Sequence, residues 1–228
     1  MTTPQPHCYP YPHPAVTTDV ALFSIRNEAL SVLLIQRANP PFAGMWALPG
    51  GFLEIDEDLE RCAQRELQEE TGIADVYLEQ LYTFGKPGRD PRERVISVTY
   101  LGLSRDDALQ PKASSDAREA AWFPLSRLPA LAFDHADIIE LARQRLVAKL
   151  GYSTIAFQLL PESFTLSRLQ TVYEILLGET LDKRNFRKGM LARDILRETG
   201  EFSRTGNHRP ARTYRVANPS RVEIIKAC

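Results

Sequence analysis

The first 125 residues alternate apolar runs with short polar breaks. Residues 16–25 and 29–37 are apolar and rich in β-branched side chains, and only the three residues 26–28 separate them, which predicts two strands joined by a short turn. Residues 76–84 and 94–103 predict two more strands around a polar loop, and residues 119–125 predict a further short one. Residues 38–51 are rich in Pro and Gly and are expected to form a loop.

Two other segments have helical spacing. The first helix is expected to begin near Asp56 and to end at Gly72, a residue suited to a helix C-cap. The second covers residues 134–150, where Ile138, Ala142 and Leu146 recur at every fourth position. We therefore expect an α/β fold with a mixed sheet between two helices over residues 15–150, preceded by a flexible Pro-rich arm at residues 1–14.

The pattern changes after Gly151. A helical stripe is expected between an N-cap at Thr165 and an end at Gly178, and a second, basic helix begins at about Asp182. Residues 201–216 contain two strand-like runs around a Gly-Asn turn, which predicts a β-hairpin. Two helices followed by a basic hairpin predict a winged helix-turn-helix domain at residues 151–228 that binds DNA.

Charge is divided unequally along the chain. Residues 1–150 contain 15 Lys and Arg against 21 Asp and Glu, whereas residues 151–228 contain 13 against 8, so the net charge of −1 hides an acidic part and a basic part. This asymmetry favours a metal ion as partner of the first part and a polyanion as partner of the second. Three distant cysteines, no secretory signal and no long apolar run predict a protein of the cytoplasm that does not enter membranes.

The most acidic stretch is residues 51–73, with eight Asp and Glu in 23 residues. Helical geometry places Glu66 and Glu70 on the same face as Cys62 and Ala63, so both carboxylates are expected to point inward. Inward carboxylates with Glu69 beside them repel one another unless a cation binds, and oxygen ligands suit Mg²⁺. The alternative is an acidic face in solvent.

The spacing of this stretch resembles the Nudix box. It is Gly51, five residues, Glu57, seven residues, Arg65-Glu66-Leu67, one residue, Glu69-Glu70, one residue and Gly72-Ile73. The resemblance implies a Nudix α/β/α sandwich that hydrolyses a nucleoside diphosphate linked to another group. It also implies that Glu66, Glu69 and Glu70 hold Mg²⁺ or Mn²⁺ and activate water, with the Gly51 carbonyl as a further ligand. Glu57 and Arg65 would orient this catalytic cluster.

The polar loop at residues 85–94 supplies the candidate substrate ligands Arg89, Asp90 and Arg92, to which we add Arg37. Guanidinium groups suit diphosphate oxygens, although an ordinary charged hairpin loop would have the same composition. An RDPR loop ahead of a VISVTY strand is similar to the branch of the Nudix family that handles ADP-ribose.

In the second part of the chain, the predicted basic helix contains pairs of like charge four residues apart, which destabilise an isolated helix. Such a helix is favoured where its charges neutralise phosphates. The candidate DNA-binding residues are Lys183, Arg184, Asn185, Arg187, Lys188, Arg209 and Arg212. A basic face in solvent and a dimerisation module are the alternatives.

Residues 15–217 together resemble the Nudix-related transcriptional regulators of NAD metabolism. The resemblance rests on residues 164–188 and 209–216, which follow the Nudix-like part of the chain. This resemblance implies a homodimeric repressor of genes of NAD synthesis or salvage that senses ADP-ribose. Many of those regulators have a degraded box, but the box here is intact, so loss of catalysis does not follow. The alternatives are a Mg²⁺-dependent ADP-ribose pyrophosphatase with a dimerising or tethering tail, and a scaffold that binds protein partners.

Overall fold

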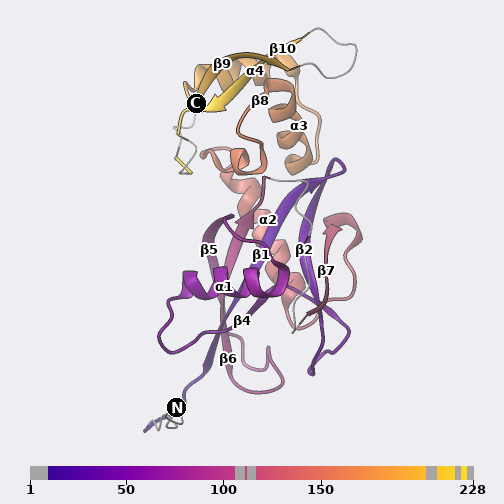
Figure 1. The fold of residues 1–228 in the computed structure, drawn as a ribbon, viewed down its shortest axis with the longest axis vertical. Coiled ribbons are helices and arrows are strands. Elements are labelled where there is room, and N and C mark those ends of the chain that lie inside the picture. Colours follow the sequence, from indigo (N-terminus) through magenta and orange to yellow (C-terminus); the bar gives the residue numbers. More distant parts are fainter. Residues whose placement is uncertain (1–9, 106–110, 112–116, 204–209, 219–221, 225–228) are drawn as a thin grey trace.

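The computed structural model describes residues 10–105, 111, 117–203, 210–218 and 222–224. A smaller helical unit with its own sheet stands at one end of a larger α/β unit (Figure 1). No helix in these described ranges has the length and apolar character that a membrane crossing requires.

The larger unit is built on one mixed seven-stranded sheet. Its strands are β1 (Ala15–Arg26), β2 (Ala29–Arg37), β3 (Trp46–Ala47), β4 (Gly50–Phe52), β5 (Tyr77–Phe84), β6 (Val95–Leu103) and β7 (Ala117–Pro124). β1 pairs in parallel with β6, and the other pairs are antiparallel. The expectation of a plain loop at residues 38–51 is wrong, because β3 pairs with β2 and β4 with β1. β4 pairs with a strand distant in sequence, whereas β3 follows β2 closely but contains only two residues, so no local pattern indicates either of them.

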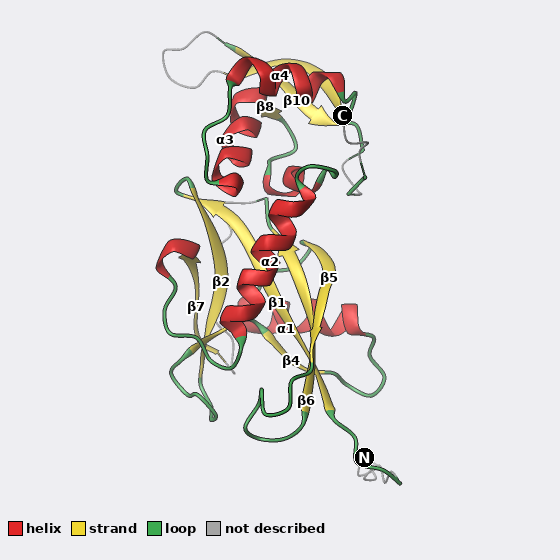
Figure 2. Cartoon of the chain, turned by 180° about the vertical axis from the view of Figure 1, so that it is seen from behind, coloured by secondary structure: helices red, strands yellow, loops and turns green. Residues whose placement is uncertain are grey.

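Helices α1 (Leu59–Thr71) and α2 (His135–Lys149) cover opposite faces of this sheet, with a short 3₁₀ turn, η1 (Leu125–Arg127), between β7 and α2 (Figure 2). Along β1, Phe23 belongs to the apolar cluster that contains α2, whereas Leu22 belongs to the cluster that contains α1. Because successive side chains of a strand point to opposite faces, a strand covered on both sides is apolar at almost every position.

The first helix begins at Leu59, three residues after the expected Asp56. Asp58 is the N-cap, and its side-chain carboxylate accepts a hydrogen bond from the Arg61 amide at 2.9 Å. The predicted end is confirmed, because Gly72 adopts a left-handed conformation with φ of 70° and donates to the Gln68 carbonyl.

The smaller unit has the winged-helix order. It contains η2 (Ile155–Leu159), β8 (Phe164–Thr165), α3 (Leu166–Leu177), α4 (Lys183–Ala192), β9 (Leu196–Ser203) and β10 (Ala211–Val216). Thr165 and Gly178 cap α3 as predicted. The hairpin is confirmed as β9 and β10, with β9 beginning earlier than expected and β8 as an additional third strand. The Gly-Asn turn lies outside the described residues.

The apolar cluster under α2 continues into the smaller unit through Ile155, Leu169 and Tyr214. The two units therefore share packing at their junction. The domain boundary after residue 150 and the arm at residues 1–14 stay predictions.

Candidate functional site

A cleft of about 430 Å³ opens in the α/β unit where β1, β2, β4, α1 and the start of α2 meet. The charged and aromatic side chains that line it are Asp19, Arg37, Phe52, Glu54, Arg65, Glu66, Glu70, Asp90, Arg92, Phe133 and His135. The cleft thus combines carboxylates of α1 with guanidinium groups and aromatic rings, most of them from the surrounding strands and loops.

The inward face expected for the acidic helix is present. Glu66 and Glu70 line the cleft, whereas Arg61, Gln64 and Gln68 are exposed on the opposite side of α1. The structure does not bring Glu69 into the cleft, and its side chain is 59% exposed. The helical repeat carries Glu69 away from the seam that Glu66 and Glu70 share.

Arg65 holds the acidic cluster together. Its guanidinium lies 2.8 Å from Glu57, 2.7 Å from Glu66 and 3.2 Å from Glu69. The hydrogen bonds from Arg65 hold the pKa of Glu57 at about 2, so this carboxylate stays ionised. Glu57 does not line the cleft, and its contact with Arg65 fits the expected orienting role.

Two glycines of β4 let the carboxylates approach the sheet. A Cβ on Gly51 would lie 2.2 Å from Glu66 Oε1, so only glycine leaves that carboxylate its place. The backbone amide of Gly50 donates to Glu70 Oε2 at 2.8 Å. Burial, together with the negative charges of Glu66 and Asp19, raises the pKa of Glu70 to about 8 despite this hydrogen bond.

These residues fit a divalent cation. The donors that face the cleft are carboxylate oxygens, which hard cations prefer. A cation would also offset the repulsion and desolvation that raise the pKa of Glu70. No group of three His, Cys, Asp or Glu side chains in the described part of the chain forms a ready-made cage. Protein carboxylates would thus supply part of the coordination, as is usual for Mg²⁺ bound with substrate phosphates.

The facing wall suits an anion attached to a flat ring. Arg92 lies between Asp90, 2.7 Å away in an ion pair, and the rings of Phe52 and Phe133 at 5.2 and 5.9 Å. Arg37 stands 4.9 Å from the Phe133 ring and donates to the Pro41 carbonyl at 2.8 Å. Guanidinium groups beside aromatic faces can bind phosphate oxygens and stack a base.

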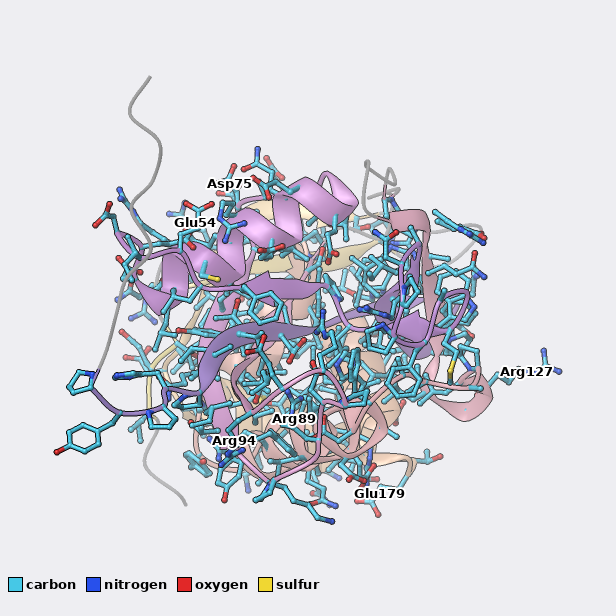
Figure 3. The ribbon with its side chains drawn as sticks, turned by 90° about the horizontal axis from the view of Figure 1, so that it is seen from below. Glu54, Asp75, Arg89, Arg94, Arg127 and Glu179 are labelled. Atoms are coloured by element: carbon cyan, nitrogen blue, oxygen red, sulfur yellow. The ribbon has the colours of Figure 1, made fainter. Side chains whose placement is uncertain are left out.

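Arg89, predicted to bind substrate, does not line the cleft. Its side chain is 4% exposed and makes two hydrogen bonds to Asp134, at 2.9 and 2.6 Å, and it also lies 3.7 Å from Asp19. Its place inside the unit contrasts with Arg127, which extends away from the body (Figure 3). Arg89 therefore ties the loop to the start of α2.

Five charged or aromatic cleft residues are absent from the sequence prediction: Asp19, Phe52, Glu54, Phe133 and His135. Buried His135 accepts a hydrogen bond from the Leu48 amide on Nδ1 at 2.8 Å, and its Nε2 lies 3.6 Å from Asp19. Burial lowers the pKa of His135. Asp19 also accepts a hydrogen bond from Ser97. A lone acid inside the apolar run 16–25 was a usable signal for Asp19, whereas no local pattern singles out the other four.

The winged unit presents the second group of predicted residues. Lys183, Arg184, Asn185 and Lys188 are exposed on α4. On the packing side, the Phe186 ring lies 5.3 Å from that of Tyr173, and Met190 is buried. Arg187 is half-buried and donates to Ser167 at 3.1 Å.

On the hairpin, Arg212 is exposed and pairs with Glu198 at 2.9 Å. Arg209 lies outside the described residues. The smaller unit thus exposes basic side chains both on α4 and on the hairpin.

The fold and the cleft define a Nudix domain joined to a winged helix. Residues 15–142 match the family model of the NUDIX domain, and residues 156–216 match that of the NrtR DNA-binding winged helix domain. The chain therefore belongs to the Nudix family, to the group whose Nudix domain precedes an NrtR winged helix.

Three known proteins are similar over large parts of the chain. The ADPR responsive transcriptional repressor NtrR of Acinetobacter baylyi is 41% identical over 91% of this chain and 84% of that protein. The crystal structure of Shewanella oneidensis NrtR complexed with a 27mer DNA has a TM-score of 0.79 at 41% identity, covering 90% of this chain and 94% of that one. The ADP-ribose pyrophosphatase of Methanocaldococcus jannaschii is 44% identical over 57% of this chain and 73% of that protein.

Proposed function

We propose that this protein is a transcriptional repressor that binds DNA through its winged helix and senses ADP-ribose through its Nudix domain. The observation that carries the proposal is the joining, in one chain, of a cleft with a carboxylate wall and a guanidinium wall to an exposed basic helix. The name of the similar repressor refers to ADPR, and the name of the similar pyrophosphatase refers to ADP-ribose. The part of this chain that is similar to both proteins is the Nudix domain, so we assign ADP-ribose binding to that domain.

Within the cleft we assign Glu66, Glu70 and the Gly51 carbonyl to the cation, with Glu69 able to join from the helix edge. Mg²⁺ is the expected ion and Mn²⁺ its substitute, because both accept oxygen ligands. When bound, such an ion neutralises diphosphate oxygens and activates water. Arg37 and Arg92 receive the diphosphate, while Asp90 orients Arg92. Arg89 and Glu57 would have positioning roles, because Arg89 fixes Asp134 and Glu57 fixes Arg65.

Helix α2 is the route from ligand to DNA. Its N-terminal end carries Asp134, which holds Arg89, and His135, which lines the cleft. Its C-terminal end leads into the shared core with α3. A ligand that contacts His135, or that shifts the loop from which Arg89 reaches Asp134, therefore acts on an element that also supports the winged helix, as a two-site coupling requires.

On DNA, Lys183, Arg184 and Lys188 would contact phosphates, and Asn185 would reach a base edge. The same helix of a second copy would read a second half-site, as helix-turn-helix proteins do on palindromic operators. We therefore propose a homodimer of the cytoplasm. Its target genes, on the resemblance to regulators of NAD metabolism, are those of NAD synthesis or salvage.

A mobility-shift experiment tests this function. DNA from upstream of its own gene and of NAD synthesis genes is titrated with the full chain at moderate salt, with and without ADP-ribose. We expect a shift that prefers these sequences and responds to ADP-ribose, and that weakens in Arg184→Ala but not in Arg127→Ala. A shift of equal strength on unrelated DNA, or one indifferent to ADP-ribose, contradicts the proposal.

Hydrolysis of ADP-ribose is the second candidate function, favoured by the intact box and by the similarity to a pyrophosphatase over the Nudix domain. It requires release of AMP and ribose 5-phosphate that depends on a divalent cation. Glu70→Gln should abolish the release while the melting temperature stays close to that of the wild type. Absence of turnover at every concentration of Mg²⁺ and Mn²⁺ would leave the protein as a sensor only.

A further inference from the structure

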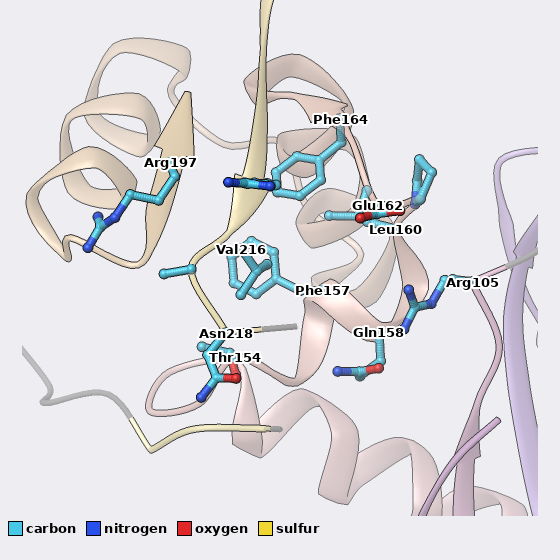
Figure 4. Close-up of a pocket in the computed structure, with 13 residues that line it drawn as sticks. Arg105, Thr154, Phe157, Gln158, Leu160, Glu162, Phe164, Arg197, Val216 and Asn218 are labelled. Carbon is cyan, nitrogen blue, oxygen red and sulfur yellow. The ribbon is translucent and has the colours of Figure 1, made fainter. Parts of the chain in front are cut away.

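A second cavity, of about 280 Å³, lies at the junction of the two units and shares no lining residue with the Nudix cleft. It is bounded by Arg105 just beyond the end of β6, by the segment from Thr154 to Phe164, and by strands β9 and β10. In Figure 4, Phe157 and Val216 lie in its middle, with Arg105 on one side and Arg197 on the other. Its wall therefore combines residues of both units.

The charge of this cavity is positive. Arg105, Arg197 and Arg215 line it, against the single acid Glu162. Arg197 and Arg215 are direct partners in the pairing of β9 with β10, and like charges in that position destabilise a sheet. An anion bound beside them would relieve this repulsion.

Only one of the three arginines is already neutralised. Arg197 lies 2.6 Å from Asp194. Arg105 and Arg215 are exposed and have no salt-bridge partner among the described residues. Two guanidinium groups from different units thus line the cavity without an ion-pair partner among the described residues, and guanidinium groups form strong charge-assisted hydrogen bonds to phosphate oxygens.

The floor between the arginines is apolar and aromatic. Phe157 and Phe164 are 6% and 4% exposed, with ring centroids 5.7 Å apart, and Leu160 is buried beside them. Gln158 and Asn218 add amide groups among the lining residues. A flat base could lie against this floor while the amides meet its polar edge.

We propose that the junction cavity is a binding site for a nucleoside monophosphate, held by its phosphate on Arg105 and Arg215 and by its base on the apolar floor. The volume of about 280 Å³ lies close to the lower end of the range of about 300–1,000 Å³ that ligand pockets span, so a single mononucleotide fits better than a dinucleotide. The occupant touches both units at once, so it stabilises their present arrangement. This site does not depend on the function proposed for the Nudix cleft.

Photolabelling of the full chain with 8-azidoadenosine 5′-monophosphate, followed by peptide mapping, tests the site directly. Label is expected on peptides that contain Phe157 or Val216, separately from any label in the Nudix cleft. Arg105→Ser and Arg215→Ser should each reduce the junction label about tenfold, the effect of losing one charge-assisted hydrogen bond, while leaving label in the cleft unchanged. Arg127→Ser is the matched control and should change neither.

Competition identifies the two halves of the ligand. Unlabelled AMP should displace the junction label at concentrations about tenfold lower than either adenosine or inorganic phosphate. Because the two arginines lie in different units, a folded variant of either one suffices for the test. Label confined to the cleft, or junction label that neither arginine variant reduces, would overturn the proposal.

Discussion

Replacing Gly51 by alanine is expected to separate cation binding from folding. Ordinary contact begins at 3.4 Å, and the new Cβ would lie 2.2 Å from Glu66 Oε1, so the carboxylate must withdraw by about 1.2 Å. That atom is the far end of a flexible side chain, and the move costs its 2.7 Å contact with Arg65. We expect unfolding free energy to change by less than about 1 kcal/mol, because the backbone is not displaced.

The functional effect of Gly51→Ala should be much larger. Displacing one ligand or catalytic group by about 1 Å commonly reduces cation affinity or activity by about 10- to 100-fold. Titration of the full chain with Mn²⁺, followed by calorimetry, measures the first quantity, and turnover of ADP-ribose measures the second if hydrolysis occurs. The melting temperature measured on the same preparation should fall by no more than about 4 °C.

Gly50→Ala is the matched comparison. Its Cβ would lie 2.1 Å from the Thr18 carbonyl oxygen and 2.8 Å from the Asp19 Cα, both of them backbone atoms that cannot move alone. We expect a loss of about 2 kcal/mol or more in unfolding free energy. Binding of Mn²⁺ by Gly51→Ala as tight as that of the wild type, or equal destabilisation of the two variants, would contradict this prediction.

Three further predictions concern other parts of the molecule. The pKa of Glu70 is about 8 without a cation, so below pH 8 the binding of Mn²⁺ must displace a proton from this carboxyl group. The affinity for Mn²⁺ should therefore rise by up to about tenfold per pH unit toward pH 8 and then level off. An affinity that stays constant from pH 6 to 8 would contradict this. Arg89→Met leaves Asp134 without its buried partner and should cost about 3 kcal/mol in urea unfolding, which an effect below 1 kcal/mol would refute. Arg184→Ala with Lys188→Ala should lower the slope of log affinity for DNA against log salt by about 0.9 per lost phosphate contact; an unchanged slope would remove both residues from the interface.

Periodicity predicted most elements because local preference and burial agree in them. The stripe of α2 and the caps of α3 depend on residues three or four positions apart, so the sequence shows them directly. β3 and β4 were missed because both are short and because β4 pairs with a strand far away in the chain. The start of α1 was placed too early because several acids near Asp56 could serve as N-caps, and only the observed hydrogen bond selects Asp58.

In the candidate site, too, some residues could be predicted from local spacing and others depend on tertiary contacts. The inward pair Glu66 and Glu70 follows from the helical repeat alone, whereas the burial of Arg89 against Asp134 depends on where a loop meets a helix 45 residues later. Composition marked Arg89 and Arg92 as equivalent. The tertiary structure buries the first and leaves the second in the cleft.

The sequence by itself determined the individual strands and helices, the acidic helix face and the basic helix, because these are properties of spacing along one element, and the spacing of residues 51–73 together with the basic tail indicated the family. Tertiary structure decided that Phe133 and His135 join Asp19 in the cleft, that Gly51 makes room for Glu66, and that a cavity lined by arginines exists at the junction. The physical reason is that such features arise from contacts between segments whose separation in sequence carries no periodic signal, so only packing brings them together.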